Sequence, residues 1–302
     1  MRITVIGETN IDIAVVRGAN GLSAGCTPGR IAFHHGGVAR NIAHNLSLLG
    51  HEVRLMTVFG GDGFASGLIA DCKAIGMDLS LSTVFEKEKS PIFLSFNDEI
   101  GNIQSAVSDI GLNRHMDLAW VERHMGEINS SDIIVADTLL SVDALACLLD
   151  RVKVPLFIDS VSPGCALRLA EALKSSEKHA AFALKCNLAE ATALSNETDA
   201  ESAAKALCAM GIAEVYLTIG ENGVIYRSET ESGHYPALTG PVVNVAGSGD
   251  AFFAGVIHAH ALGVSGKETV AYGLEMARIN IESDAPVNPS AEGFFGQSTI
   301  VP

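Results

Sequence analysis

Residues 244–255 read NVAGSGDAFFAG, and this stretch carries the most informative pattern in the chain. Three small residues, Gly247, Ser248 and Gly249, lead directly into a segment from Asp250 to Leu262 that is typical of a buried helix. Glycine lets a ligand approach the backbone closely, and the first N–H groups of a helix have no carbonyl partner within it. The stretch therefore predicts an anion-binding site at a helix N-terminus.

Asp250 stands at the start of this helix, where two interpretations are open. An acidic residue in the first turn can simply stabilise the helix dipole. A carboxylate beside an anion site can also take a proton from a hydroxyl, while the backbone N–H groups hold the charge of a transferring phosphoryl group. Both a structural and a catalytic Asp250 fit the local sequence.

Short apolar runs and helix-period segments alternate along the rest of the chain. The predicted strands are Ile3–Ile6, Val53–Phe59, Ile133–Ala136, Leu156–Ile158, Phe182–Leu184 and Val215–Ile219. The predicted helices are Val38–Leu49, Phe64–Ile75, Asp250–Leu262 and Lys267–Glu282. This alternation predicts an α/β fold with a mostly parallel central sheet. Ligands bind such sheets beyond the carboxyl ends of the strands, where Asp137 and Asp159 follow two of the runs.

Two segments depart from this rhythm and predict a small separate sheet. Ile11–Val16 and Arg30–Phe33 are extended runs on either side of a Gly-rich loop. Pro91–Phe96 and Ile103–Val107 are joined by the turn-like residues 97–102 and predict a β-hairpin. Together they could form a β lid built from about residues 11–34 and 90–108. The plainer alternative is an ordinary hairpin at the edge of the main sheet.

A second Gly-rich segment, HHGGVARN at residues 34–41, precedes the first predicted helix. Close approach of a ligand to the backbone would explain the pair Gly36 and Gly37. Asn41 lies one turn into the helix, where its amide could bond a sugar hydroxyl. The alternative is a tight loop followed by a capping residue, and we expect the two histidines to be ordinary loop residues.

Two further segments follow predicted strands. Asn187 and Glu190 are three residues apart, so they share one helical face and could hold a metal-bound water and a phosphate. The same pair also fits a capping box, N-x-x-E, with no ligand at all. Thr218, Gly220 and Gly223 end another strand and could cradle a nucleotide, or could simply form a Gly-rich hairpin turn.

Composition narrows the classes of partner. The 302 residues include 20 Lys and Arg against 35 Asp and Glu, a formal net charge of −15. This balance disfavours nucleic acid and anionic membranes, which reward a basic surface. The six cysteines are widely spaced without a C-x-x-C pair, so we expect reduced thiols in a cytoplasmic protein. The first apolar run is too short for a signal peptide or a membrane span.

Motifs of several other enzyme classes are missing from the sequence. There is no G-x-x-x-x-G-K-[ST] P-loop, no H-E-x-x-H zinc motif and no G-x-S-x-G nucleophile elbow. The missing G-x-G-x-x-G fingerprint weakens the alternative of a Rossmann oxidoreductase. His258 and His260 fall in mid-helix two residues apart, so their rings point to different faces and do not predict a metal site.

Taken in order, these segments resemble the signatures of the PfkB, or ribokinase-like, family of carbohydrate kinases. The resemblance spans roughly residues 2–290 and rests on residues 36–41, 60–63, 187–190, 218–223 and 246–250. It implies a Rossmann-like ribokinase fold, in which residues 1–302 form one kinase domain with helices flanking a mostly parallel sheet and a small β lid. Within the family, residues 36–46, 159–162 and 286–289 are similar to those of pseudouridine kinases.

The resemblance also implies roles for the residues singled out above. Asp250 would be the general base, and the N–H groups of Gly247, Ser248 and Gly249 would neutralise charge on the γ-phosphoryl group of ATP. Glu190 would hold Mg²⁺ through water. The residues implied in substrate binding are Asp12, Gly36, Gly37 and Asn41. The residues implied in ATP binding are Asn187, Thr218, Gly220 and Gly223. The product would be pseudouridine 5′-phosphate.

Several alternatives stay open within and beyond this family. The substrate could be another sugar or nucleoside, such as ribose, adenosine, inosine or fructose, and a non-catalytic nucleoside-binding protein could use the same fold. Asn244 and Val245 stand where the family signature usually has Asp-Thr, next to a monovalent-cation site of many relatives. The departure leaves activation by potassium open. The exposed strands of the lid could also join two copies into a homodimer.

Overall fold

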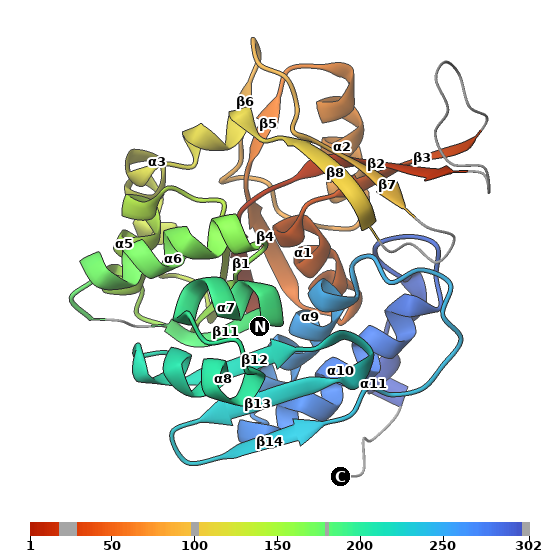
Figure 1. The fold of residues 1–302 in the computed structure, drawn as a ribbon. Helices are drawn as coiled ribbons and strands as arrows, with labels where there is room; N and C mark the ends of the chain where they lie inside the picture. Colours follow the sequence, from red (N-terminus) through yellow and green to blue (C-terminus); the bar gives the residue numbers. More distant parts are fainter. Residues whose placement is uncertain (18–28, 98–102, 179–180, 298–302) are drawn as a thin grey trace.

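The computed structural model describes residues 1–17, 29–97, 103–178 and 181–297, so Cys26 and most of the turn predicted at 97–102 lie outside the described residues. Eight strands form the main sheet. They are β1 (Arg2–Ile6), β4 (Glu52–Met56), β9 (Ile133–Asp137), β10 (Leu156–Asp159), β11 (Ala181–Asn187), β12 (Glu214–Thr218), β13 (Val224–Ser228) and β14 (Ser232–Tyr235). Their order is β14-β13-β12-β11-β10-β9-β1-β4 (Figure 1). Pairing is parallel from β4 to β12 and antiparallel for β13 and β14, which confirms the predicted α/β class.

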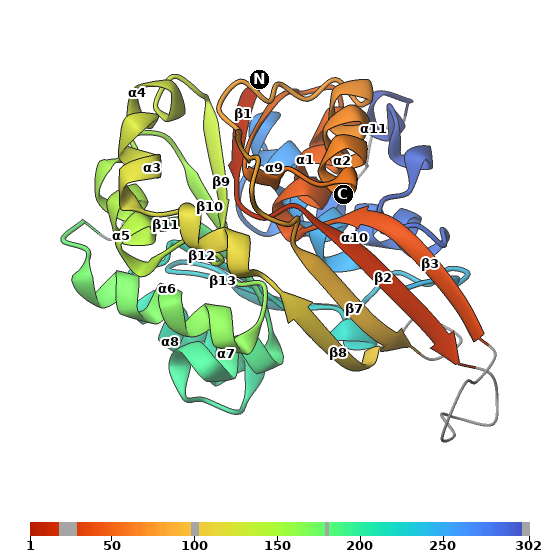
Figure 2. The same ribbon diagram turned by 90° about the horizontal axis from the view of Figure 1, so that it is seen from above.

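Helices cover both faces of this sheet (Figures 1 and 2). On one side lie α1 (Val38–Leu48), α9 (Ser248–Ala261) and α10 (Thr269–Ile281). On the other side lie α3 (Leu118–Arg123), α4 (Met125–Ile128), α5 (Val142–Arg151), α6 (Pro163–Ser175), α7 (Leu188–Ser195) and α8 (Ala200–Ala209). Alternate residues of a strand point to opposite faces, so each strand feeds two cores. In β9, Ile133 and Val135 pack in one core, while Ile134 and Ala136 pack in the other.

The single strand predicted over Val53–Phe59 is wrong. The chain leaves the main sheet after Met56 and forms β5 (Val58–Gly60), which pairs in parallel with β6 (Thr83–Phe85) in a separate two-stranded sheet. Buried Thr57 lies at the break, where its carbonyl accepts a bond from the Thr83 N–H and its own N–H donates to Ser82 Oγ. An unbroken apolar run shows that both pieces are buried, but it does not show that their partner strands differ. The antiparallel strands β13 and β14 were also not predicted.

A four-stranded sheet projects from the main body, as Figure 2 shows. Its strands are β2 (Asn10–Arg17), β3 (Gly29–Gly36), β7 (Ile92–Asn97) and β8 (Ile103–Asp109), in the order β3-β2-β7-β8. We call these strands the small sheet. They confirm that a separate small sheet exists, while the grouping of residues 1–302 into one domain with a lid stays a prediction. His34 and His35 lie on β3, so their assignment to a loop is wrong.

The remaining elements connect these layers. They are α2 (Gly63–Ala74), α11 (Phe294–Gln297) and short 3₁₀ turns at Gly111–His115, Gly220–Asn222, Gly266–Glu268 and Pro289–Ala291. Among the described residues, no helix is both long and apolar enough to cross a bilayer. The five cysteines of the described part of the chain are free thiols, four of them buried. The single tryptophan, Trp120, is buried and donates its indole N–H to Thr83 Oγ1.

Candidate active site

The structure brings Asn41 and Asp250 together, although 209 positions separate them in the chain. Asn41 Nδ2 of α1 donates to Asp250 Oδ2 at the start of α9, over 2.9 Å. Both residues are buried, and Asp250 is only 8% exposed. The contact follows from the packing of α1 against α9 on one face of the main sheet. Two motifs that are far apart in the sequence therefore form one polar cluster.

The turn before α9 depends on Gly247. This residue has φ 74°, in the left-handed region that favours glycine, and an added Cβ would collide with the Pro286 carbonyl oxygen. The turn is closed by bonds from Ser248 N to Val245 O and from Ala251 N to Gly247 O. The N–H groups of Gly249 and Asp250 fall in the first helical turn, where no carbonyl lies one turn back to accept them. This geometry agrees with an anion site at the helix N-terminus.

The surroundings of Asp250 act on the pKa of its carboxyl group in opposite directions. Burial raises the pKa of Asp250 to about 7 and the neighbouring Asp159 adds to the rise, while Lys185 and the Asn41 amide oppose it. A carboxyl group with a pKa near neutral pH can accept and release a proton under ordinary conditions, as a general base must. A first-turn acid that only stabilised the helix dipole would need neither burial nor this set of neighbours.

The substrate-side glycines pack against the chain itself. An added Cβ on Gly36 would overlap the Asp12 carboxylate and the Asn10 side chain. Gly37 has φ 98° and lies against the Glu8 carbonyl. Burial raises the pKa of the Asp12 carboxyl to about 6, opposed by the Arg40 charge and a hydrogen bond from Asn10. Gly36 thus makes room for Asp12, the carboxylate predicted to bind substrate.

The two histidines before these glycines have different surroundings. His34 is the cross-strand partner of Asp12, so both side chains project from the same face of the small sheet. His35 Nδ1 lies 3.2 Å from Asp71 Oδ2, and Arg40 NH2 donates to the same oxygen over 2.6 Å. This ion pair ties α1 to α2 behind the glycine pair. His34 is therefore the histidine that belongs to the site, and the sequence analysis had set it aside.

Asn187 and Glu190 form the capping box of α7 in full. Asn187 Oδ1 accepts from the Glu190 N–H, and Glu190 Oε2 accepts from the Asn187 N–H. The Glu190 carboxylate also accepts from Ser160 Oγ over 2.6 Å and from Asn187 Nδ2 over 2.6 Å, and the residue is 2% exposed. A carboxylate so fully bonded fits a role through bound water better than direct ligation of a metal. The described residues contain no cluster of three or more metal-binding side chains.

The predicted nucleotide segment lies beside this capping box. Thr218 is the register partner of Asn187 across β12 and β11, and its hydroxyl donates to the Cys186 carbonyl. Gly220 has φ 61° with open space where a Cβ would be, while Gly223 has φ 93° and lies against the Tyr235 carbonyl. The segment is thus a hairpin turn between β12 and β13. This hairpin also leaves an open backbone position at Gly220, two residues after the register partner of Asn187.

Three buried charged residues of the site were missed or only noted in passing. Lys185 Nζ donates to Asp159 Oδ2 over 3.0 Å, and an added Cβ on Gly249 would lie 2.9 Å from the same nitrogen. Glu8 follows β1, and its Oε1 accepts from Asn113 Nδ2 over 2.7 Å. Burial and the nearby Asp137 raise the pKa of Glu8 to about 8. The sequence signal that could have found them is that ligands bind beyond the carboxyl ends of the strands. This rule identified Asp159, but the next strand was predicted to end at Leu184, one residue before Lys185.

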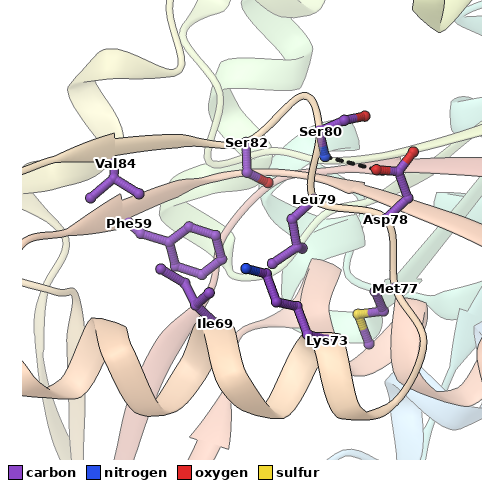
Figure 3. Close-up of a pocket in the computed structure, with 9 residues that line it drawn as sticks. All are labelled: Phe59, Ile69, Lys73, Met77, Asp78, Leu79, Ser80, Ser82 and Val84. Carbon is purple, nitrogen blue, oxygen red and sulfur yellow. Dashed lines mark hydrogen bonds between the residues drawn. The ribbon is translucent and has the colours of Figure 1, made fainter.

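A hollow, shown in Figure 3, lies away from the candidate site and has a different lining. It measures about 440 Å³ and lies between β5, α2 and the segment before β6. Its lining residues are Phe59, Ile69, Lys73, Met77, Asp78, Leu79, Ser80, Ser82 and Val84. Asp78 accepts from the Ser80 N–H within it. None of the predicted site residues lines this hollow, and it has neither a buried carboxylate nor a glycine turn before a helix.

Comparison with known proteins adds to this geometry. The family model for pfkB family carbohydrate kinases matches residues 1–292. The chain belongs to this family. As a pfkB-family protein, it is an ATP-dependent sugar or nucleoside kinase with the ribokinase fold.

Named relatives within the pfkB family cover most of the chain. A pseudouridine kinase of Escherichia coli strain K12 is 29% identical, over 95% of this chain and 92% of that protein. A guanosine-inosine kinase of Exiguobacterium acetylicum is 26% identical, over 91% of this chain and 93% of that protein. A ribokinase structure from Thermotoga maritima superimposes with a TM-score of 0.81 at 20% identity, over 96% of this chain and 95% of that one. The last similarity shows the fold alone.

Proposed function

We propose that this kinase transfers the γ-phosphoryl group of ATP to the 5′-hydroxyl of pseudouridine. The observation that carries the chemistry is the hydrogen bond between Asn41 and Asp250, because it joins the substrate-side motif to a buried carboxylate at the start of α9. The choice of pseudouridine is supported by the similarity to the E. coli pseudouridine kinase over nearly the whole chain. Asp12, Gly36, Gly37 and Asn41 would form the side of the site that takes the ribose.

In this proposal the Asp250 carboxylate accepts the proton of the attacking 5′-hydroxyl. A bond forms between the 5′-oxygen and the γ-phosphorus, and the bond from the γ-phosphorus to the bridging oxygen of ADP breaks. The negative charge of the transferring group is met by the N–H groups of Gly247, Gly249 and Asp250, since the Ser248 N–H already donates to the Val245 carbonyl. ADP leaves with the electron pair of the broken bond, and Asp250 then returns its proton to solvent. The residues contribute mainly position and electrostatics.

The nucleotide would lie along Asn187, Thr218, Gly220 and Gly223. Mg²⁺ bound to the ATP phosphates would offset part of their negative charge, and Glu190 would act on that ion through water. The donor set suits this division, because Mg²⁺ usually keeps several waters and is held largely by substrate phosphates. Asn244, at the position where the family usually has Asp, accepts from the Ala246 N–H and donates to the Asp284 carbonyl, so both ends of its side-chain amide are bonded within the protein.

The experiment that tests the proposal measures ATP consumption with Mg²⁺ over a panel of acceptors. The panel contains pseudouridine, uridine, adenosine, inosine, guanosine, ribose and fructose. Turnover is followed by ADP release, and the phosphorylated position is read from the ³¹P and ¹H spectra of the product. Asp250→Asn is the control for contaminating kinases.

The expected result is turnover with pseudouridine, little with uridine, and a 5′-phosphate product. Because pseudouridine and uridine share the ribose and differ in how the base is attached, this pair tests recognition of the base. Faster turnover with another acceptor would replace the substrate while keeping the phosphoryl-transfer chemistry. ATP binding without turnover across the panel would contradict the proposed substrate and favour the non-catalytic alternative.

A further inference from the structure

The proposed mechanism leaves one buried cation of the site without a task. Lys185 lies near the carboxyl end of β11, two residues before the capping box, and its side chain is only 10% exposed. Lysine is rarely buried unless its ammonium is paired. Its register partner on β10 is Asp159, which has no exposed surface, and the two are joined by the 3.0 Å ion pair. The pair spans neighbouring strands at the edge where the site lies.

A strained turn fixes the carboxylate of this pair. Val161 has φ 61°, a left-handed conformation that is rare for a β-branched residue. Its N–H donates to Asp159 Oδ1 over 2.9 Å, which leaves Asp159 Oδ2 for Lys185. Such strain persists where surrounding contacts outweigh it, and it is concentrated at functional sites. The turn after β10 thus holds Asp159 in the orientation that anchors the ammonium.

The anchored ammonium lies against the anion site. Gly249, in the first turn of α9, approaches so closely that an added Cβ would lie 2.9 Å from Lys185 Nζ. Burial by itself would lower the pKa of Lys185, but the charges of Asp159, Asp250 and Glu190 outweigh it and raise the pKa above the usual range. The side chain therefore carries a full positive charge beside the free N–H groups of this turn.

We propose that the Lys185 ammonium, held by Asp159, contacts the transferring phosphoryl group together with the free N–H groups at the start of α9. The inference deepens the kinase function proposed above and rests on it. During transfer the negative charge of the phosphoryl group is spread over its three peripheral oxygens, and a preorganised cation in a buried site stabilises that charge strongly. Lys185 keeps its protons throughout, since Asp250 takes the proton of the acceptor hydroxyl.

A matched set of variants tests this role. Lys185→Met removes the charge but keeps a long apolar side chain, and Lys73→Met makes the same change at an exposed lysine of the hollow in Figure 3. We expect Lys185→Met to lower kcat by about 10²–10³-fold, the scale of losing one donor from an oxyanion hole. The KM for the accepted nucleoside should change less than about threefold, because that side of the site is untouched. Lys73→Met should behave as wild type.

The pH profile gives a second readout. Four groups on neighbouring elements act on the Asp250 carboxyl. They are Lys185 on β11, Asp159 on β10, Asp12 on β2 and the Asn41 amide on α1. Removing the cation leaves only carboxylates and one amide around Asp250, so its pKa rises. The acidic limb of the kcat/KM profile should therefore move to higher pH in Lys185→Met. An unmoved limb would show that the Lys185 charge does not act on Asp250 and would contradict its placement beside the reacting groups, whereas the loss of kcat reports its contact with the phosphoryl group.

The double variant Asp159→Asn with Lys185→Met separates catalysis from folding, because it removes both charges of the pair. We expect it to fold and to remain as slow as Lys185→Met alone. Recovery of wild-type turnover in the double variant would overturn the inference, since the lysine would then serve only to neutralise Asp159. Wild-type turnover of Lys185→Met itself would do the same. If wild-type protein phosphorylates no acceptor of the panel, the proposed function fails instead.

Discussion

Asp250 is held between two opposing influences on its charge. Burial raises its pKa to about 7, while Lys185 and Asn41 favour the ionised carboxylate. A base must be unprotonated to accept a proton, so kcat/KM should climb about tenfold per pH unit below pH 7 and level off above it. The measurement is kcat/KM for the accepted nucleoside from pH 5.5 to 9 at constant ionic strength. A flat profile between pH 5.5 and 7 would contradict the assignment of Asp250 as the base.

The same residue gives a second prediction, on substitution. Asp250→Asn keeps the size and the contact with Asn41 but cannot take up a proton, so turnover should fall by about 10²–10⁴-fold, the usual contribution of a general base. ATP affinity, measured by calorimetry, should change little. Turnover within tenfold of wild type would remove Asp250 from the mechanism.

Stability provides the control for that substitution. The folded-state pKa of Asp250 lies above the unfolded value of 3.8, so burying this carboxylate costs stability that grows as pH rises from about 4 to about 7. Asparagine carries no charge at any of these pH values. Asp250→Asn should therefore melt at a higher temperature than wild type at pH 8, with the difference narrowing towards pH 5. A loss of activity accompanied by a lower melting temperature at pH 8 would indicate damage to the fold.

The sequence predicted a site residue where that residue belongs to a short local motif. It did not predict a contact that depends on how helices pack or how strands are aligned. Asp250, Asn41 and Glu190 each occur in a short motif with a chemical interpretation. The contact of Asn41 with Asp250 could not be predicted, because it depends on how α1 packs against α9. Lys185 follows an apolar run that reads simply as the end of a strand. Its pairing with Asp159 appears only once β10 and β11 are aligned.

At the scale of elements, the start of α9 makes a prediction about backbone shape. Gly247→Ala would place a Cβ against the Pro286 carbonyl at φ 74°, so the turn must shift and the anion site with it. We expect turnover to fall more than about tenfold, together with a lower melting temperature. Gly263→Ala, at the other end of the same helix, has φ 83° but open space for the Cβ. It should lose about 1–2 kcal/mol of stability and keep wild-type turnover.

The two alanine variants are compared with each other by steady-state kinetics and by thermal melting. Both substitutions carry the cost of a left-handed alanine, so their difference isolates the collision with Pro286. Equal activity of the two variants would show that the shape of the turn before α9 does not matter for turnover.

The capping box of α7 allows its structural and functional interpretations to be separated. Asn187→Ala should cost about 1 kcal/mol through loss of the N-cap. Asp199→Ala removes the cap of the next helix, α8, where the side chain accepts from the Ser202 N–H. Both variants should melt at lower temperature, but only Asn187→Ala should raise the KM for ATP. An unchanged KM for ATP in Asn187→Ala would leave the capping role as its whole contribution.

Helices and strands were predicted well where a single periodicity runs through the whole element. They were predicted poorly where one apolar run is divided between two sheets. The strands predicted from Ile133, Leu156 and Val215 and the helices predicted from Val38 and Asp250 agree with the structure within a few residues. The run from Val53 to Phe59 failed, since its two halves belong to different sheets. The small sheet was predicted from paired extended runs, but its order β3-β2-β7-β8 joins segments far apart in sequence.

At the scale of the whole molecule, the small sheet presents an apolar row across all four of its strands. Phe33, Ile13, Leu94 and Val107 are register partners in turn, so they project from one face. Phe33 is 61% exposed and Val107 69% exposed. Asp12 and His34 project from the opposite face. Ile13 packs partly against the cluster around Phe59 and Leu68, so the apolar side chains left exposed lie at the two ends of the row. Exposed apolar side chains of this size on a chain of net charge −15 favour burial against a second copy.

We therefore expect a homodimer joined through the small sheets. Light scattering after gel filtration should give twice the chain mass of 31.6 kDa for wild type. The variant Phe33→Asp with Val107→Asp should give the monomer mass, because it places charges on that face. Val84→Asp, at an exposed apolar residue of the hollow in Figure 3, should stay dimeric. A monomeric wild type over the micromolar range would contradict the expectation.

The turn before α9 also affects the order in which the protein becomes competent during synthesis. Gly247 rests on Pro286, and Asn280 donates to the Ala246 carbonyl, so the anion site is finished only by residues of the last tenth of the sequence. Asn41, which bonds Asp250, leaves the ribosome among the first. A nascent chain can thus form one end of its main sheet, with β1 paired to β4 and β9, long before it can use ATP as a substrate. Incomplete chains released by stalled ribosomes would be catalytically silent.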